Sequence, residues 1–250
     1  MAEKSSLQVS LVTGGAGEIG QAIVRSLLKK QHHVVVNYKG SEDEQAALSF
    51  IGSLKGEMQK YIKLIRADVS QPTEVKALFE EAISWKGQLH HLVNNAAIGL
   101  FKPIAKMTDD DVTSIFSVNF YGTFYTCRAA AKHLSKGGSI INLSSSSTAQ
   151  MLPGYGLYSA TKGAIEQLSR VLAKELGPKG INVNVVSPGP IDTAAFYSGK
   201  SDQFVERLKQ LSPHNRIGQP GEVGDLVAFL ASAEASWING QIIKVNGGAV

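Results

Sequence analysis

The chain has 250 residues, of which 43% are hydrophobic and 18% charged, a composition that fits one large α/β domain or two small ones. The net charge of +4 comes from scattered lysines and arginines, so nucleic-acid binding is not expected, although the excess could help a phosphate-bearing ligand to approach. Cys127 is the single cysteine, which excludes an internal disulfide and a thiolate metal cluster.

Short apolar segments alternate with longer helical patterns along the whole chain. The segments predict strands over Gln8–Thr13, His33–Asn37, Ile62–Ala67, Leu89–Asn94, Ser139–Leu143, Ile181–Val186 and Gln241–Val245. The patterns predict helices that include Gln21–Lys30, Thr73–Ser84, Tyr158–Leu176 and Pro220–Ala231. This alternation indicates a single α/β domain whose parallel sheet is covered by helices on both faces. Between 194 and 215 the pattern loosens, which predicts a substrate lid or, alternatively, an ordinary surface helix.

The first predicted strand runs directly into a glycine-rich turn and then into a helix. Glycines let the backbone turn sharply and approach a diphosphate, and the helix amino terminus supplies N–H donors. The spacing Gly15-x-Gly17-x-x-Gly20, in this strand–turn–helix context, predicts a dinucleotide site. We therefore expect cofactor contacts from Gly14, Gly15, Gly17, Glu18, Ile19 and Gly20.

Polar and small residues follow the next three predicted strands. The acidic residue that would bind a ribose 2′-hydroxyl is absent after the second strand. Asn37 would not repel a 2′-phosphate there and Lys39 could pair with one, so NADP(H) is favoured and NAD(H) stays possible. Asp68 offers an acceptor to an adenine amino group. The cofactor contacts expected from this region are Asn37, Tyr38, Lys39, Asp68, Val69, Asn95, Ala96 and Ala97.

Tyr158 and Lys162 lie four residues apart at the start of a predicted helix, so they project from the same face. A nearby ammonium stabilises a phenolate, and such a tyrosine could exchange a proton with a carbonyl or alcohol oxygen. The pair alone would more often be an ordinary surface pair. Ser145, where the fifth predicted strand ends, favours the catalytic interpretation because chemistry gathers at the carboxyl ends of parallel strands.

Together these segments resemble the single-domain short-chain dehydrogenase/reductase family across nearly the whole chain. The resemblance implies a Rossmann-type, doubly wound, seven-stranded parallel sheet and usually a homotetramer. The motifs that carry it are the Thr13–Gly20 turn, Asp68-Val69, Asn94-Asn95-Ala96, Asn119, Ser145, Tyr158 with Lys162, Pro188-Gly189 followed by Thr193, and Gly247-Gly248. Three positions depart from the family pattern: Glu18 and Ala97 replace glycines, and Asn246 replaces a common aspartate. A carboxylate at Glu18 would be unfavourable beside a diphosphate unless it points to solvent.

The resemblance also implies a role for each catalytic residue. Tyr158 would donate and accept the proton, and Lys162 would lower the pKa of Tyr158 and hold the nicotinamide ribose. Ser145 would hydrogen-bond the substrate oxygen, and Asn119 would lie in mid-helix and hold a water in a relay from Lys162 to solvent. The residues expected to line the nicotinamide are Pro188, Gly189, Ile191 and Thr193.

The function that follows is an NAD(P)-dependent oxidoreductase that interconverts a small-molecule ketone or aldehyde and an alcohol. The chain is most similar to bacterial 3-oxoacyl-[acyl-carrier-protein] reductases, so a 3-oxoacyl thioester or related ketone is the first substrate to consider. Those reductases tend to carry arginines at two carrier-docking positions, where this chain has Tyr125 and Lys179. A sugar or alcohol dehydrogenase and a non-catalytic dinucleotide sensor are the alternatives. Candidates for an apolar substrate pocket are Met151, Leu152, Phe196 and Tyr197.

Several classes of site and location are not expected. The histidines lack metal-ligand spacing, and His32, His33, His90 and His91 flank strand starts, so we predict no catalytic metal. No apolar run is long enough to span a bilayer, and the polar segment Met1–Ser6 carries no signal sequence. These features predict a cytoplasmic protein that does not associate with membranes.

Overall fold

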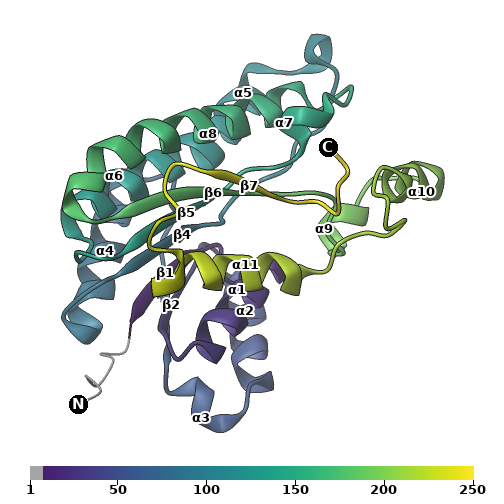
Figure 1. Ribbon diagram of the computed structural model, residues 1–250. Helices are drawn as coiled ribbons and strands as arrows, with labels where there is room; N and C mark the ends of the chain where they lie inside the picture. Colours follow the sequence, from purple (N-terminus) through teal and green to yellow (C-terminus); the bar gives the residue numbers. More distant parts are fainter. Residues whose placement is uncertain (1–7) are drawn as a thin grey trace.

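A seven-stranded parallel sheet forms the centre of the molecule (Figure 1). The computed structural model describes residues 8–250, so the predicted lack of a leader at Met1–Ser6 lies outside the described residues. The strands run in the order β3-β2-β1-β4-β5-β6-β7. Their bounds are β1 (Val9–Thr13), β2 (His33–Tyr38), β3 (Ile62–Arg66), β4 (His91–Asn94), β5 (Ser139–Leu143), β6 (Asn182–Pro188) and β7 (Ile242–Val245). The chain winds outward from β1 in one direction and from β4 in the other, which confirms the predicted doubly wound, Rossmann-type fold.

Helices cover both faces of this sheet (Figure 1). One face carries α1 (Glu18–Lys29), α2 (Ser41–Ser53), α3 (Gly56–Gln59) and α11 (Pro220–Leu230). The other carries α4 (Pro72–Lys86), α5 (Asp109–Phe116), α6 (Thr123–His133) and α8 (Gly156–Leu176). Three shorter helices lie near the carboxyl ends of the strands: α7 (Ser147–Gln150), α9 (Ala194–Tyr197) and α10 (Asp202–Gln210). The single turns are η1 (Ile104–Lys106), η3 (Gly177–Lys179) and η4 (Ala233–Ala235), and η2 (Ser117–Gly122) is a π-helix.

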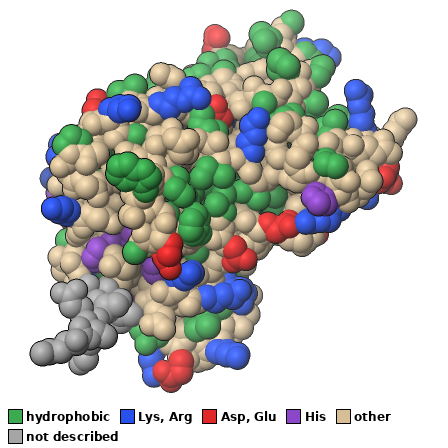
Figure 2. Space-filling view, in the orientation of Figure 1, with side chains coloured by type: hydrophobic (Ala, Val, Ile, Leu, Met, Phe, Trp, Pro, Cys, Tyr) green, Lys and Arg blue, Asp and Glu red, His purple; other side chains and the backbone are tan. Residues whose placement is uncertain are grey.

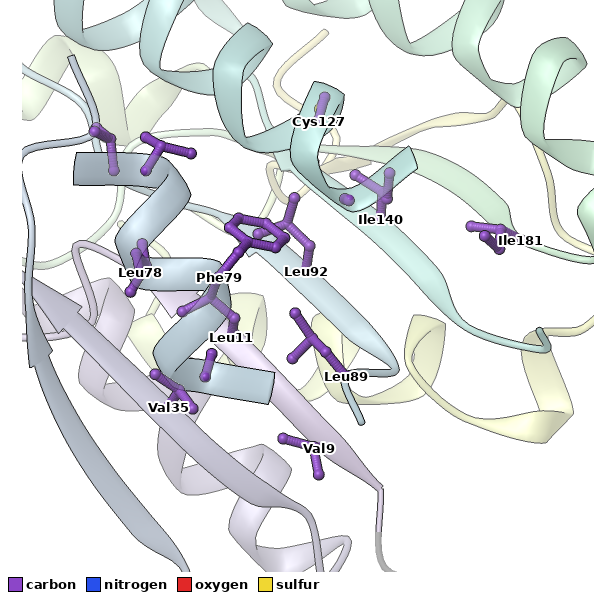
Figure 3. Packing of buried hydrophobic residues seen from close by; sticks show 14 of the residues in the cluster. Val9, Leu11, Val35, Leu78, Phe79, Leu89, Leu92, Cys127, Ile140 and Ile181 are labelled. Atoms are coloured by element: carbon purple, nitrogen blue, oxygen red, sulfur yellow. The ribbon is translucent and has the colours of Figure 1, made fainter. Parts of the chain in front are cut away.

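Alternate side chains of each strand supply two separate hydrophobic layers, as expected for a sheet that is buried on both faces. Leu11 of β1 belongs to the layer that also holds Phe79 and Cys127 (Figure 3). The next residue, Val12, belongs to the opposite layer with Ile23 of α1. Cys127, in α6, is 2% exposed.

Four buried histidines gather at the amino ends of the strands, opposite the edge where ligands bind in folds of this kind. His32, His33, His90 and His91 are each at most 7% exposed. Ser10 Oγ lies 2.7 Å from His32 Nδ1, and Ser139 Oγ lies 2.9 Å from His91 Nδ1. Burial, together with the neighbouring His90 and Lys30, lowers the pKa of His32 to about 4. Burial also holds the pKa of His91 well below its ordinary value, so both rings are neutral at neutral pH.

Two structural features are absent from residues 8–250. No helix in this range combines the length and the apolar character needed to cross a membrane. In the same range, no group of three or more His, Cys, Asp or Glu side chains is arranged to hold a metal ion.

Candidate active site

A cavity of about 790 Å³ opens along the carboxyl ends of the strands. This volume lies in the range of small-molecule and cofactor sites. Of the predicted catalytic and cofactor-binding residues, only Gly15 and Asn119 do not line it. The predicted residues on its wall are Gly14, Gly17, Glu18, Ile19, Gly20, Asn37, Tyr38, Lys39, Asp68, Val69, Asn95, Ala96, Ala97, Ser145, Tyr158, Lys162, Pro188, Gly189, Ile191 and Thr193.

The glycine-rich turn between β1 and α1 forms a cradle that leaves no room for side chains at two positions. Gly14 has φ +58°, and a Cβ there would lie 2.8 Å from Ala96 Cα. A Cβ on Gly20 would lie 2.7 Å from Gly15 Cα and closer still to the Gly14 carbonyl oxygen. Gly17 is different, because its Cβ would meet nothing closer than 3.7 Å. Such a bare cradle at a helix amino terminus fits the diphosphate of a dinucleotide.

The turn is tied to the end of β4 by Thr13 and Asn95. Thr13 Oγ1 accepts hydrogen bonds from the backbone N–H groups of Asn95 and Ala96, both at 3.1 Å. Asn95 Nδ2 donates to the carbonyls of Thr13 at 3.1 Å and Gly14 at 2.9 Å. The Asn95 side chain therefore shapes the cradle, and it is the backbone of this segment that is left for a cofactor.

The predicted adenosine end of the cavity lies beside β2 and β3. Lys39 Nζ and Asp68 Oδ2 form an ion pair at 2.8 Å. Burial raises the pKa of Asp68, but hydrogen bonds from Lys39 and Ser70 outweigh this effect and leave that pKa below its ordinary value. The Asn37 side chain turns into the sheet and donates to the Ala67 carbonyl at 2.9 Å. Lys39 is thus the basic group in position to meet a 2′-phosphate, and Asn37 fixes the strand beneath it.

The proposed catalytic residues meet on the cavity wall. Tyr158 and Lys162 project from the first turns of α8, and Lys162 Nζ lies 5.6 Å from the centre of the Tyr158 ring. Lys162 is 3% exposed and donates to the Leu143 carbonyl, at the end of β5, at 2.9 Å. Ser145 follows two residues later and lines the same cavity as Tyr158. The carboxyl end of β5 and the start of α8 therefore bring a hydroxyl, a phenol and an ammonium together on one wall of the cavity.

The protonation of this group differs from the expectation. Burial raises the pKa of Tyr158 to about 12, and the neighbouring Ser145 hydroxyl offsets part of that rise. Burial lowers the pKa of Lys162 to about 8. Burial, rather than the Lys162 ammonium 5.6 Å from the ring centre, dominates the pKa of Tyr158, so the predicted lowering by Lys162 is not found. The tyrosine is a protonated phenol at neutral pH, which is the form that can donate.

Asn119 lies behind the catalytic pair, fully buried in the π-helix η2, which connects α5 and α6. Its Oδ1 accepts from the Ile98 N–H at 2.8 Å, and its Nδ2 donates to the Ile98 carbonyl at 3.0 Å and to Thr161 Oγ1 at 3.2 Å. A π-helical turn in place of the predicted regular helix leaves backbone groups less regularly paired, as is frequent at functional sites. The Asn119 side chain itself is fully engaged in holding the Ile98 loop against α8.

The segment predicted as a lid contains α9 and α10, and both helices are capped. Thr193 Oγ1 accepts from the Phe196 N–H at 3.1 Å, and Ser201 Oγ accepts from the Phe204 N–H at 3.3 Å. Glu18, whose carboxylate was expected to disturb a diphosphate, accepts from the Ala194 N–H at 2.7 Å. The carboxylate is therefore directed at the start of this segment.

Several cavity residues were not identified from the sequence. Phe101, Gln150, Tyr155 and Lys200 line the wall beside Ser145 and Tyr158. They come from loops and short helices, where no periodic pattern marks them. Of the four apolar candidates, Leu152 and Phe196 line the cavity, whereas Met151, which is 83% exposed, and Tyr197 do not.

Several known proteins are similar to this chain over nearly its whole length. The family model described as Enoyl-(Acyl carrier protein) reductase matches residues 14–250. A "Short-chain type dehydrogenase/reductase" of Picea abies is 38% identical, over 97% of this chain and 92% of its own. An Arabidopsis thaliana "NADPH-dependent aldehyde reductase-like protein, chloroplastic" is 39% identical, over 97% and 94%. Among solved structures, a blue fluorescent protein from a metagenomic library, in complex with NADPH, has a TM-score of 0.90 at 32% identity and covers 97% of this chain and 98% of its own.

One assignment follows from the glycine cradle, the Ser145–Tyr158–Lys162 group and these similarities along nearly the whole chain. The chain belongs to the short-chain dehydrogenase/reductase family of oxidoreductases.

Proposed function

We propose that this enzyme uses NADPH to reduce the carbonyl group of a small ketone or aldehyde to an alcohol. The observation that carries the proposal is that Ser145, Tyr158 and Lys162 share one cavity with the bare cradle of Gly14 and Gly20. Lys39 beside the predicted ribose site supports NADP(H) over NAD(H). The relative named as an NADPH-dependent aldehyde reductase and the neighbour in complex with NADPH support the same cofactor and reaction class.

The residues of the chain act mainly by orienting the substrate and supplying a proton. NADPH, when bound, supplies the hydride to the carbonyl carbon. Ser145 and the Tyr158 phenol donate hydrogen bonds to the carbonyl oxygen and stabilise the negative charge that develops on it. Tyr158 then gives its proton to that oxygen, and the Lys162 ammonium lies close by to supply a replacement. We propose that this replacement follows a water-mediated path past Asn119 to solvent.

Absorbance of the reduced nicotinamide tests this function directly. We expect wild-type enzyme to oxidise NADPH in the presence of an aryl aldehyde. Tyr158→Phe should abolish turnover and leave NADP⁺ affinity nearly unchanged, because Phe keeps the ring and removes only the hydroxyl. Tyr61→Phe is the matched control, since it removes the same hydroxyl from an exposed tyrosine that does not line the cavity. Full activity of Tyr158→Phe would refute the assignment.

A 3-oxoacyl thioester is a second candidate substrate. The description of the matching family model favours an acyl-carrier substrate. Of the two expected docking positions, Tyr125 and Lys179, only Lys179 is basic. Its ammonium donates to the Ala131 carbonyl at 3.1 Å on the molecular surface. NADPH oxidation by a 3-oxoacyl thioester, compared with its pantetheine-free ketone, distinguishes this substrate from a simple carbonyl. A sugar dehydrogenase would instead reduce NADP⁺ with glucose.

We also propose a homotetramer. β7 is an edge strand of the sheet, and hydrophobic side chains gather over β7 and α11 on the face shown in Figure 2. Edge strands and apolar faces of this kind favour association between copies. Light scattering after gel filtration would give the mass of a tetramer if the proposal is right. Location in the cytoplasm stays a prediction.

A further inference from the structure

The substrate end of the cavity, defined by Phe101, Gln150, Tyr155, Phe196 and Lys200, combines aromatic walls with an ammonium that has no carboxylate partner in the described part of the chain and an amide donor that has no hydrogen-bond partner there. The Phe101 ring lies 4.3 Å from the Tyr155 ring and 5.4 Å from the ring of Tyr158. The planes of these ring pairs are inclined by 33° and 64°, so an angled aromatic surface continues directly from the proton donor. Such a wall favours a planar, aromatic substrate body through offset or edge contacts.

Lys200 places a positive charge against this wall. Its Nζ lies 5.2 Å from the centre of the Phe101 ring and 5.0 Å from that of Phe196. Its hydrogen-bond partner is the Phe196 carbonyl, and partial burial lowers its pKa from the ordinary value. The lysine is therefore fixed between two rings and partly desolvated.

No carboxylate balances this charge among residues 8–250. By contrast, two lysines elsewhere do form ion pairs: Lys102 with Asp111 at 2.8 Å, and Lys209 with Glu206 at 3.1 Å. The carboxylates on the cavity wall are Glu18, Asp43 and Asp68, which lie at the glycine-rich turn and the adenosine end. An unneutralised cation in a partly desolvated site attracts an anionic ligand group strongly.

Gln150 supplies the second donor. Its Nε2 is buried and has no hydrogen-bond partner among the described residues. A buried amide without a partner is costly, so a substrate acceptor at this place would be stabilised. The Gln150 amide would therefore be stabilised by an acceptor atom of the substrate, and the Lys200 ammonium by an acceptor that carries negative charge.

We propose that the natural substrate is an aromatic carbonyl compound that carries a carboxylate, and that Lys200 is the residue that selects it. This inference rests on the proposed carbonyl reduction. The ring stacks along Phe101 and Tyr155 with its carbonyl oxygen at Ser145 and Tyr158. The carboxylate pairs with the Lys200 ammonium, and Gln150 donates to a further acceptor of the same molecule.

The test compares para-formylbenzoate with its uncharged methyl ester. Binding of each to the enzyme in the presence of NADP⁺ is measured by calorimetry, so that the readout does not depend on turnover. A charge-assisted hydrogen bond in a partly buried site predicts that wild type prefers the acid by roughly tenfold to a hundredfold. Lys200→Met should remove this preference and Lys200→Arg should retain it. Lys209→Met, which removes the same charge from a lysine that is paired on α10, should leave the preference intact.

The outcomes separate this inference from the proposed function. Equal affinity of wild type for acid and ester, or an equal effect of Lys200→Met and Lys209→Met on their ratio, would overturn the role of Lys200. A Lys200-dependent preference in binding without NADPH oxidation by either aldehyde would support that role and count against carbonyl reduction instead. When both aldehydes are reduced, the ratio of their kcat/KM values should follow the binding preference.

Discussion

The carboxylate of Glu18, in the first turn of α1, accepts a hydrogen bond from the backbone N–H of Ala194, the first residue of α9, at 2.7 Å. The two residues are 176 positions apart in the chain. This contact joins the wall of the predicted cofactor site to the segment that carries Phe196 and Lys200, the segment predicted as a lid. A residue that departs from its family's usual glycine thus acquires a definite structural role.

Glu18→Ala should therefore loosen the segment predicted as a lid. A hydrogen bond to an exposed carboxylate contributes about 1 kcal/mol, so we expect tryptic cleavage after Lys200 to become about fivefold faster. Glu18→Gln keeps an acceptor oxygen and should restore most of the protection. Glu42→Ala, which removes an exposed carboxylate from the first turn of α2, is the control. Unchanged cleavage after Lys200 in Glu18→Ala would show that the contact does not hold the segment.

The second and third glycines of the dinucleotide fingerprint, Gly17 and Gly20, differ in what they tolerate. A Cβ on Gly20 would collide with the backbone of Gly14 and Gly15, whereas one on Gly17 meets only ordinary contacts. Overpacking costs roughly 1–3 kcal/mol, so Gly20→Ala should weaken NADP⁺ binding about tenfold or more. Gly17→Ala should bind within about twofold of wild type, since no atom must move. Equal losses in the two variants, measured by calorimetry, would contradict the steric argument.

Lys39 should contribute to the choice between NADPH and NADH. It is exposed and paired with Asp68, so a 2′-phosphate would gain only a surface ion pair, about 1 kcal/mol or about fivefold in affinity. Lys39→Ala should weaken NADPH binding by that factor and leave NADH binding nearly unchanged. Lys63→Ala, which removes a lysine paired with Glu81, is the matched control. An equal loss of affinity for both cofactors would mean that Lys39 does not recognise the 2′-phosphate.

The pH dependence of reduction should report on Lys162. With its pKa lowered to about 8, Lys162 loses its proton above that pH, while Tyr158, raised to about 12, keeps its own. The rate of carbonyl reduction should therefore fall as pH rises through about 8, by about tenfold per pH unit once the ammonium is gone. Lys162→Arg, which stays charged, should be less active but lose this descending limb. A limb that stays near the same pH in a folded Lys162→Arg enzyme would assign it to another group.

Stability should fall on mild acidification because of the buried histidines. The folded-state pKa of His32 is about 4, below the ordinary 6.5 of the unfolded chain. Both states are neutral above pH 6.5, so stability is fully present there and is lost as pH falls towards 4. His32 alone should cost about 3 kcal/mol by pH 4. Urea unfolding at pH 7 and pH 5 measures the loss, and His32→Asn, which retains a polar group near Ser10, should reduce it. An unfolding free energy that is the same at both pH values would contradict this account.

The parts of the fold and site that the sequence predicts are those encoded by local patterns. The turn from Gly14 to Gly20 and the Tyr158–Lys162 spacing each lie within one short segment, and the structure places both on the same cavity. Strand positions were also predicted closely, because buried parallel strands are short apolar runs with clear ends. The main shifts are at boundaries: β4 begins at His91 rather than at Leu89, and β6 continues to Pro188.

The parts that could not be predicted depend on contacts between distant segments. Asn37 turns into the sheet because β3 lies beside β2, and a single strand does not reveal its neighbour. The raised pKa of Tyr158 depends on the burial of the assembled site rather than on spacing. Phe101 and Lys200 belong to separate loops that meet only in the folded chain. Loop residues carry no periodicity, so no pattern marks them before folding.

The four histidines lie at the opposite end of the strands from Ser145 and Tyr158. The groups that set acid tolerance are therefore separate from those that set the chemistry. Replacing His32 or His91 should extend the pH range in which the enzyme survives without altering how it handles its substrate. Protein engineering could therefore change stability in acid and catalytic activity independently in this molecule.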